Sequence, residues 1–405
     1  MAQALALGWE SQQAFLAKLV QCPSDNPVGD CAPHGELTAG LLAELGFTVE
    51  RHPVDAAALQ ACGMRSATNL VVRRNFGGQG PTIALNAHGD VVPPGAGWRR
   101  DPYGAQVDAG VMYGRGVAVS KSDFATYAFA LLALEPLRDQ LQGAVELHFT
   151  YDEETGGEIG PRRLLQQGIS APDLCISAGF CHGVVTAHNG CLHLQVVVTG
   201  VSAHAAKPDS GVDALEATTA LLSQLYRLRR DFPAQRSAIP GIGHPNITVG
   251  LIEGGINTNV VPDKITLRLD RRMTPEEDAA RVEADLRKLI ADTLDGYPGI
   301  GCEITRPLLA NPLKRLPGAE RLIAPLQRYG AEILGHPLQE EGVPLYTDAR
   351  LYAEAGIPTV AFGAGPASFL EANGHRADER LTLTDLRAAT TIVALALAEL
   401  LARPS

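Results

Sequence analysis

The chain reads Ile83-Ala84-Leu85-Asn86-Ala87-His88-Gly89-Asp90 at the point around which its other motifs are arranged. The apolar first half of this run predicts a buried strand, and His88 and Asp90 follow at its carboxyl end. In open α/β sheets, ligands and catalytic groups gather at that end of the strands, and side chains two residues apart point the same way. A metal-binding His commonly gives its second ring N–H to such a carboxylate. A polar strand end followed by a turn aspartate is the alternative interpretation.

A second apolar strand also ends in acidic residues. Residues 145–150 predict a strand, which leads directly into Tyr151-Asp152-Glu153-Glu154. Adjacent side chains on an extended chain point in different directions, so one carboxylate can bind a metal while the other faces a reacting water. Two exposed glutamates in a loop are the alternative.

The pattern of helices and strands predicts two kinds of domain. Helices alternate with strands over most of the chain, which is typical of an α/β domain with a mainly parallel central sheet. Residues 189–308 differ, because half-solvated strands and two long helices predict a small α+β domain there. We therefore expect a catalytic domain formed by residues 1–188 and 309–405, with an α+β domain of residues 189–308 inserted into it.

Composition excludes several classes of partner. The 405 residues carry a net charge of −11, and the acidic residues are spread along the chain. Nucleic acids and anionic membranes both reward a concentrated basic surface, so we expect neither as a partner. No window reaches the roughly 18 apolar residues of a membrane span, and the N-terminus does not resemble a signal peptide. The seven cysteines, without paired spacing, favour a reducing cytoplasm.

Further motifs follow His88 along the chain. They are Trp98-Arg99-Arg100-Asp101-Pro102-Tyr103, Gly114-Arg115-Gly116 with Lys121, and Gly374-His375-Arg376-Ala377-Asp378-Glu379. With the two strand ends, these runs resemble metallopeptidase family M20, which includes acetylornithine deacetylases, succinyl-diaminopimelate desuccinylases, aminoacylases and glutamate carboxypeptidases. The resemblance spans essentially the whole chain. It implies a catalytic domain of the phosphorylase/hydrolase-like, zinc exopeptidase type, and an inserted lid or dimerisation domain that makes a homodimer.

The resemblance also implies roles for the residues of the catalytic domain. Glu153 matches the family's general base and Glu154 a metal ligand, while His88 and His375 match two further ligands. Asp90 matches the carboxylate that orients the first histidine. A loop or helix-capping role is the alternative for His375.

Four more residues match family positions that contact the substrate. His204, in a His-Ala-x-x-Pro run, matches a histidine that reaches into the partner subunit's active site and hydrogen-bonds the oxyanion. Asn259 and Arg272 match positions that bind the substrate's carboxylate or carbonyl, and Arg350 is a similar candidate. A surface loop histidine is the alternative for His204.

The chain departs from the family at two metal ligands. Val119 stands where the family has its bridging aspartate, and the run around Gly179 offers no acid where the family has another carboxylate. His88, Glu154 and His375 remain, and two histidines with a glutamate form a known mononuclear zinc set. We therefore expect one divalent ion per subunit rather than two, with zinc first and manganese or cobalt as alternatives.

Two residues could replace the missing ligands. Asp123 follows Val119 by four positions, one helical turn along the same face. Its favoured interpretation is instead a helix-capping partner of Ser120 in a Ser-x-x-Asp arrangement. His182, just past the missing acid, resembles a ligand of some amidase branches of the family, and an ordinary polar loop histidine is its alternative.

The site residues together indicate a metal-dependent hydrolase. We expect it to cleave an amide or other C–N bond in a small carboxylate-bearing substrate, as N-acyl amino acid deacylases and peptidases do, by water attack with Glu153 as base. One alternative is a hydrolytic deaminase or amidohydrolase acting on a non-peptide C–N bond. The other is a non-catalytic relative that binds a metabolite.

Overall fold

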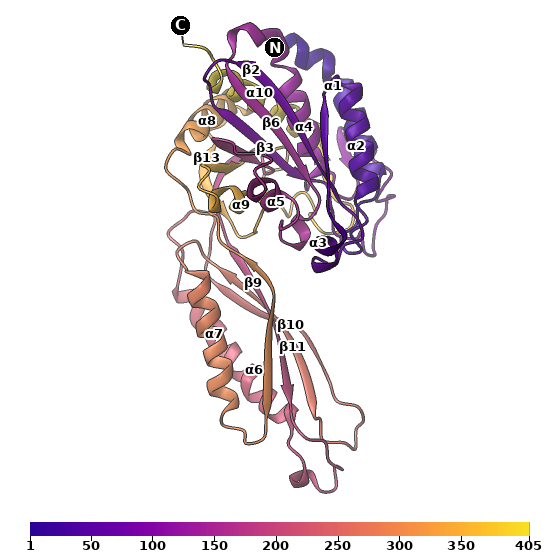
Figure 1. Ribbon diagram of the computed structural model, residues 1–405, viewed down its shortest axis with the longest axis vertical. Coiled ribbons are helices and arrows are strands. Elements are labelled where there is room, and N and C mark those ends of the chain that lie inside the picture. The colour runs from indigo at the N-terminus through magenta and orange to yellow at the C-terminus, as the bar shows by residue number, and fades with distance from the viewer. Residues whose placement is uncertain (405) are drawn as a thin grey trace. The chain divides into compact units, whose positions relative to one another are not determined.

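The computed structural model describes residues 1–404, which form two compact units (Figure 1). The first unit contains Met1–Thr186, Arg315–Glu341 and the chain from Thr347 onward, and the second contains Ala187–Lys314 and Gly342–Tyr346. The short segment Gly342–Tyr346 joins the second unit through backbone hydrogen bonds. Gly342 donates to the carbonyl of Pro240 at 2.7 Å, and Val343 accepts from Asn189 at 3.2 Å.

The first unit is built on an eight-stranded sheet. Its strands, in spatial order, are β1 (Val49–Pro53), β2 (Thr68–Gly77), β6 (Gly143–Thr150), β3 (Thr82–His88), β7 (Leu174–Ser177), β14 (Thr359–Ala361), β8 (Gly183–His188) and β13 (Gln339–Val343). The central strands β6, β3, β7 and β14 run parallel, whereas β1, β2 and β8 pair antiparallel with their neighbours. The predicted α/β domain with a mainly parallel central sheet is confirmed.

Helices pack on this sheet, most of them through one continuous apolar core, whereas Leu165 and Tyr352 belong to a small separate cluster with Ala84 and Cys175. They are α1 (Ala2–Gln21), α2 (Ala32–Glu44), α3 (Ala56–Ala61), α4 (Lys121–Leu132), α5 (Pro161–Gln166), α8 (Glu320–Leu334), α9 (Ala349–Glu354) and α10 (Leu383–Leu400). The apolar run from Phe124 to Leu137 predicts a buried helix, and α4 is indeed buried along nearly its whole length, but it ends at Leu132. Pro136 cannot donate to an α-helical hydrogen bond, and the chain continues as a 3-10 turn over Glu135–Gln140.

A small three-stranded sheet also belongs to the first unit. It joins β15 (Arg380–Thr382), β5 (Val111–Tyr113) and β4 (Gln106–Asp108) in that order. Strand β15 follows His375, and β5 precedes the Gly-Arg-Gly motif. The pairing of Arg380 with Tyr113 therefore brings the chain just after His375 next to that motif.

The second unit is an α+β sandwich, as predicted. Its antiparallel sheet has the order β10 (Asn246–Gly254), β11 (Lys264–Met273), β9 (Gly190–Thr199) and β12 (Gly301–Ala310). Helices α6 (Ala214–Asp231) and α7 (Ala279–Leu294) share an apolar core with the alternate residues of β9 and β11. The sequence predicts a helix from Pro275 to Leu294. Helix α7 instead begins at Ala279, because the Asp278 side chain caps it by accepting from the backbone N–H of Arg281 at 2.8 Å.

Two general features complete the fold. Within residues 1–404, no helix combines the length and the apolar character needed to cross a membrane. All seven cysteines are free thiols, and four of them, Cys31, Cys175, Cys181 and Cys191, are buried.

Candidate active site

Neighbouring parallel strands bring the two acidic motifs together. Strand β3 pairs with β6 so that His88 lies opposite Thr150, and Glu153 and Glu154 follow three and four residues later. One ligand atom from each of His88, Glu153 and Glu154 lies within 4.8 Å of the others. His375 reaches the same place, with its Nε2 3.2 Å from Glu154 Oε1. Glu154 therefore lies between two imidazoles.

Asp90 is the buried carboxylate that organises this edge of the sheet. Its Oδ1 accepts from the backbone N–H of Glu153 at 3.2 Å, and its Oδ2 accepts from that of Glu154 at 3.1 Å and from Asn26 Nδ2 at 3.0 Å. The hydrogen bond from His88 Nδ1 goes to the backbone oxygen of Asp90 at 2.9 Å, while Asp90 Oδ1 lies 3.4 Å away. Asp90, the expected carboxylate partner of His88, thus mainly holds the backbone of Glu153 and Glu154 in place.

The partner of Nδ1 fixes the tautomer of His88. A backbone carbonyl can only accept, so Nδ1 carries a proton. When the ring is neutral, its Nε2 lone pair is therefore on the side of Glu153, whose Oε2 lies 4.0 Å away. This is the arrangement in which an imidazole binds a metal, with its other nitrogen bonded to a protein acceptor.

A buried ion pair attaches the His375 loop to the Gly-Arg-Gly motif. Arg115 Nη1 donates to Glu379 Oε2 at 2.6 Å, and both side chains are about 1% exposed. The Glu379 carboxylate also accepts from the backbone N–H groups of Gly116 at 3.2 Å, Ala118 at 3.1 Å and Val119 at 3.2 Å. His375 has a φ of 59°, in the left-handed region that histidine adopts more often than most residues. The loop is therefore tied down four residues after the candidate ligand.

The electrostatics of the cluster favour a cation. Burial raises the pKa of Glu153 well above its ordinary value, Glu154, Asp348 and Asp90 raise it further, and His88 opposes them. Burial disfavours the charged form of His88, but the charges of Glu153 and Asp90 outweigh it and hold the His88 pKa well above the usual range. Two imidazoles and converging carboxylate oxygens suit a divalent metal ion, whose charge would offset the excess of acids.

Two further buried carboxyl groups lie behind the glutamate pair, and the sequence analysis missed them. Asp152 Oδ2 accepts from Ile159 N at 2.7 Å, whereas Asp152 Oδ1 and Asp348 Oδ2 have no hydrogen-bond partner among residues 1–404. Burial raises the pKa of Asp348 to about 7. Asp348 stands two positions before Arg350 in the same short motif, so its sequence context was the available signal.

Arg350 has a structural role at this place. Its guanidinium is about 1% exposed, and it donates to the Gly156 carbonyl at 2.6 Å and to Glu354 Oε1 at 3.1 Å. These bonds connect α9 to the loop that carries Glu153 and Glu154. The buried Arg350 guanidinium is thus bonded within the protein, where we had expected it to bind the substrate.

The structure accounts for the acid missing at Gly179. A Cβ at this position would lie 2.8 Å from the backbone nitrogen of Phe362 and 2.9 Å from the carbonyl carbon of Ala361. Real Cβ atoms essentially never approach backbone so closely, and the end of β14 cannot give way as a flexible side chain could. No side chain, acidic or otherwise, fits there without a shift of the backbone.

The favoured interpretation of Asp123 as a capping partner of Ser120 is wrong. Ser120 precedes α4 without a side-chain cap, and its Oγ instead bonds the backbone nitrogen and oxygen of His88 at 3.1 and 3.0 Å. Asp123 Oδ1 accepts from the backbone N–H of Ala364 at 2.7 Å. Burial raises the pKa of Asp123 to about 7.

His182 joins a different group of side chains. Its Nε2 lies 3.3 Å from Asp385 Oδ1, and its Nδ1 lies 3.2 Å from His336 Nε2. Within residues 1–404, no hydrogen bond or ion pair connects it with His88, Glu154 or His375.

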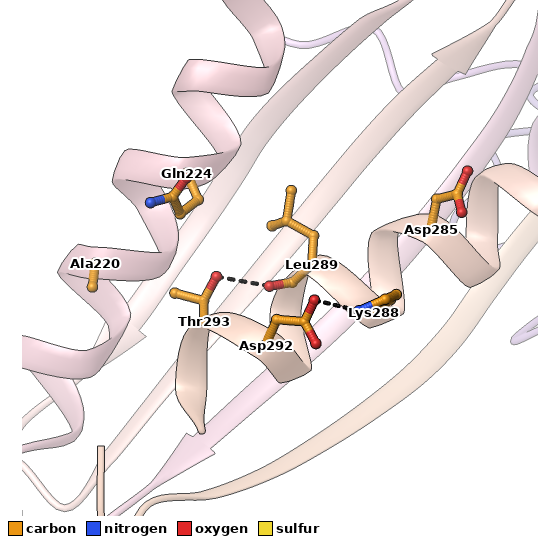
Figure 2. A pocket seen from close by; sticks show the side chains of 7 residues that line it. All are labelled: Ala220, Gln224, Asp285, Lys288, Leu289, Asp292 and Thr293. Carbon is orange, nitrogen blue, oxygen red and sulfur yellow. Dashed lines mark hydrogen bonds and ion pairs between the residues drawn. The ribbon is translucent and has the colours of Figure 1, made fainter. Parts of the chain in front are cut away.

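Three predicted substrate-binding residues lie in the second unit. His204 and Asn259 are exposed on adjacent loops, which a backbone hydrogen bond from Ala205 to the Asn259 carbonyl connects at 3.0 Å. Arg272 is half-buried, and it donates to Asp270 from Nε at 2.9 Å and from Nη2 at 3.2 Å. The groove between α6 and α7 in Figure 2 is lined by neither histidine nor cysteine, and its Lys288–Asp292 pair is an ordinary surface ion pair at 2.6 Å.

Comparisons with known proteins identify the family. The model of peptidase family M20/M25/M40 matches residues 84–399. The chain belongs to this peptidase family. A succinyl-diaminopimelate desuccinylase of Gluconacetobacter diazotrophicus is 27% identical over 398 residues, with 95% of both chains covered. The enzyme of the same name from Rhodospirillum rubrum is 30% identical over 300 residues, covering 70% of this chain and 73% of its own.

Solved structures of M20 proteins have the same fold. A metallo-carboxypeptidase of Sulfolobus solfataricus matches with a TM-score of 0.77 at 16% identity, covering 95% of this chain and 98% of its own. A dinuclear metal-binding peptidase of Bacillus subtilis matches with a TM-score of 0.69 at 18% identity, covering 98% and 99%. This M20 protein is a hydrolase that acts on C–N bonds with a divalent metal cofactor.

Proposed function

We propose that this M20 hydrolase cleaves the amide bond of a small N-acyl amino acid or dipeptide, using one divalent ion, zinc in the first place, at His88, Glu154 and His375. The convergence of His88, Glu153 and Glu154 within 4.8 Å, with His375 3.2 Å from Glu154, is the observation that carries the proposal. A metal ion bound there lowers the pKa of a water molecule to about 7 and polarises a carbonyl.

Glu153 is the general base in this proposal. Glu153 takes a proton from the attacking water and gives it to the leaving nitrogen. Both transfers are most efficient when the pKa of the Glu153 carboxyl lies near the working pH. Burial, with three neighbouring acids, raises the pKa of Glu153 in that direction. Asp90 keeps Glu153 and Glu154 in register through their backbone N–H groups.

A single ion at the catalytic site is supported by what surrounds the positions of the missing ligands. Val119 has no ligand atom, the backbone of Ala361 and Phe362 fills the space beside Gly179, and Asp123 accepts from the backbone of Ala364. The remaining nitrogen and oxygen donors are those of a three-ligand catalytic zinc site with a position left for water.

The substrate carries a carboxylate in this proposal. The names of the desuccinylase relatives point to an acyl group with its own carboxylate. Arg272 offers a half-buried guanidinium whose orientation Asp270 fixes, and arginine binds carboxylates through two parallel hydrogen bonds. Exposed His204 and Asn259 are the proposed contacts to the oxyanion and the substrate carbonyl.

A cytoplasmic homodimer completes the proposal. Strand β10 forms an edge of the second unit's sheet, and Leu251 and Ile252 on it are 52% and 51% exposed. An exposed apolar edge strand is a natural pairing surface for a second copy. Free thiols at all seven cysteines agree with a reducing compartment.

A substrate panel tests the proposed reaction. Metal-free protein is loaded with zinc, manganese or cobalt and mixed with N-succinyl and N-acetyl amino acids and dipeptides, and the released amine is measured. We expect release from a carboxylate-bearing amide, and its loss in Glu153→Gln. Inert amides together with ammonia release from a non-acylated amine would overturn the proposal.

A further inference from the structure

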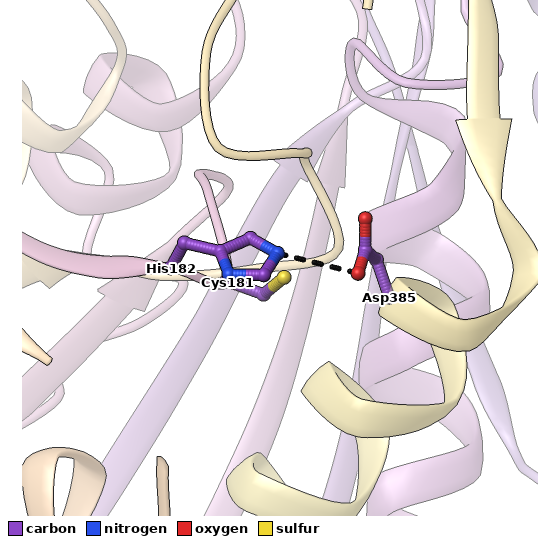
Figure 3. A group of neighbouring side chains, drawn as sticks. All are labelled: Cys181, His182 and Asp385. Atoms are coloured by element: carbon purple, nitrogen blue, oxygen red, sulfur yellow. Dashed lines mark hydrogen bonds and ion pairs between the residues drawn. The ribbon is translucent and has the colours of Figure 1, made fainter. Parts of the chain in front are cut away.

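A second group of metal-binding side chains lies around His182. One ligand atom from each of Cys181, His182 and Asp385 lies within 4.8 Å of the others. They come from the loop after β7 and the first turn of α10, and Figure 3 shows the His182 ring directed toward the Asp385 carboxylate, with the Cys181 sulfur beside the ring. The group is separate from that of His88, and it does not depend on the proposed function.

The hydrogen bonds around His182 leave two acceptors facing each other. His336 Nδ1 lies 3.4 Å from the Pro337 carbonyl, which can only accept, so the proton is on Nδ1 and His336 Nε2 is an acceptor. His182 Nδ1, 3.2 Å from that Nε2, must then be the donor. The neutral His182 ring therefore presents its Nε2 lone pair to Asp385 Oδ1 at 3.3 Å. A lone pair and a carboxylate oxygen repel each other unless a cation lies between them.

The other carboxylate oxygen is already occupied. Asp385 Oδ2 accepts from the Thr382 hydroxyl, so Oδ1 is the oxygen left for a ligand. His336 and Thr382 thus hold the two outer groups as hydrogen-bonded neighbours hold metal ligands in known sites.

The charges of the group match a divalent ion. Burial raises the pKa of the Cys181 thiol, so this cysteine is not a thiolate without a nearby cation, and metal coordination deprotonates a thiol outright. A thiolate, a carboxylate and a neutral imidazole balance the charge of a 2+ ion. One sulfur, one nitrogen and one oxygen ligand suit zinc, with cobalt as its spectroscopic substitute.

We propose that Cys181, His182 and Asp385 form a second metal site that binds zinc, with His336 as the outer hydrogen-bond partner of His182. The bound ion joins the loop containing Gly179 to the start of α10. A proton on His182 Nε2 is the competing occupant, and it would exclude a metal ion from that nitrogen.

Cobalt titration distinguishes the two occupants. Co²⁺ is added to the metal-free full-length protein, and the absorption band of thiolate-to-cobalt charge transfer is recorded. The ligands proposed at His88, Glu154 and His375 contain no sulfur, so a sulfur band does not come from that site. We expect the band in the wild type and in Glu154→Gln, and its loss in Cys181→Ser. Hydrolysis measured in the same variants keeps the two proposals separately testable.

Two further variants give a graded result. His336→Gln should weaken cobalt binding by about 10- to 100-fold without abolishing the band, as loss of an outer partner does. His244→Gln is its control, because His244 also bonds the carbonyl of a following proline, at 2.7 Å from Pro245. Asp385→Asn should weaken binding while the sulfur band remains, which covers the case of Cys181→Ser failing to fold.

Two results would overturn the proposal. One is the absence of a sulfur band in the wild type at saturating cobalt. The other is a band that survives in Cys181→Ser and disappears in Cys191→Ser. Cys191 lies 3.3 Å from His193 Nε2, but Arg272 already supplies a positive charge to Asp270 in that group.

Discussion

The Asp90 carboxylate accepts the backbone N–H of Glu154 at 3.1 Å, so one buried side chain sets the position of a proposed metal ligand in the turn that follows the neighbouring strand β6. In Asp90→Asn an NH2 group replaces one accepting oxygen and faces a backbone donor. We expect metal affinity and kcat/KM to fall by about 10- to 100-fold, and stability to fall by about 1–3 kcal/mol. Metal titration and thermal unfolding measure both effects. Asp108→Asn, at an exposed ion pair with Arg100, is the control, and equal behaviour of the two variants would contradict the prediction.

Glu153 and Glu154 should respond differently to the same substitution. Glu153→Gln removes the base and leaves the proposed ligands intact, so kcat should fall by about 100- to 10,000-fold with metal content unchanged. Glu154→Gln should also lose the ion of the catalytic site. Steady-state kinetics and elemental analysis of the two variants give the comparison. A Glu153→Gln variant with wild-type kcat would exclude Glu153 as the base.

The Arg115–Glu379 pair should control both stability and the His375 loop. Glu379→Gln leaves a buried guanidinium without its counter-charge, and breaking a buried pair costs about 3–5 kcal/mol. We expect a lower Tm and weaker metal binding, because His375 lies four residues before the lost contact. Glu371→Gln, at an exposed position of the same loop, should change neither quantity. Unchanged metal affinity in folded Glu379→Gln would show that the pair does not position His375.

Asp123 should make the metal-free protein less stable as the pH rises. Its pKa is about 7 in the folded protein and about 3.9 in an unfolded chain. The folded state therefore binds the proton more tightly, and stability decreases from about pH 4 to pH 7 by about 1.4 kcal/mol per pH unit for this group. Asp123→Asn should remove this part of the pH dependence. The stability of the variant relative to the wild type should therefore be highest at pH 8. Tm measured in chelator from pH 5 to 8 tests it, and parallel curves for the two proteins would contradict it.

Local patterns in the sequence predict much of the fold. The run from Thr82 to Ala87 predicts a buried strand, and β3 extends only one residue further, to His88, because a continuous apolar run bounded by polar residues determines it. The strands β4, β5 and β15 could not be predicted, since each has three residues and forms only through pairing with distant segments. The last residues of the second unit, Gly342–Tyr346, join it through backbone contacts that leave no sequence pattern.

The candidate site divides in the same way. His88 and the glutamate pair could be placed together because both follow parallel strands at one edge of a sheet. The partners of Asp123 and His182 depended on contacts across the fold. Ala364, which donates to Asp123, is 241 positions away, and Asp385 is 203 positions from His182. Neither distance leaves a local signal from which a partner could be inferred.

The metal content of Cys181→Ser tests the central claim most directly, because this variant lacks the second site and leaves the first untouched. The purified variant is saturated with zinc, freed of excess metal by gel filtration and analysed for ions per chain, beside the Cys181→Ser/Glu154→Gln double variant. We predict one zinc ion per chain in the first protein and none in the second. Two tightly bound ions in Cys181→Ser, or one ion retained in the double variant, would contradict a single catalytic ion at His88, Glu154 and His375.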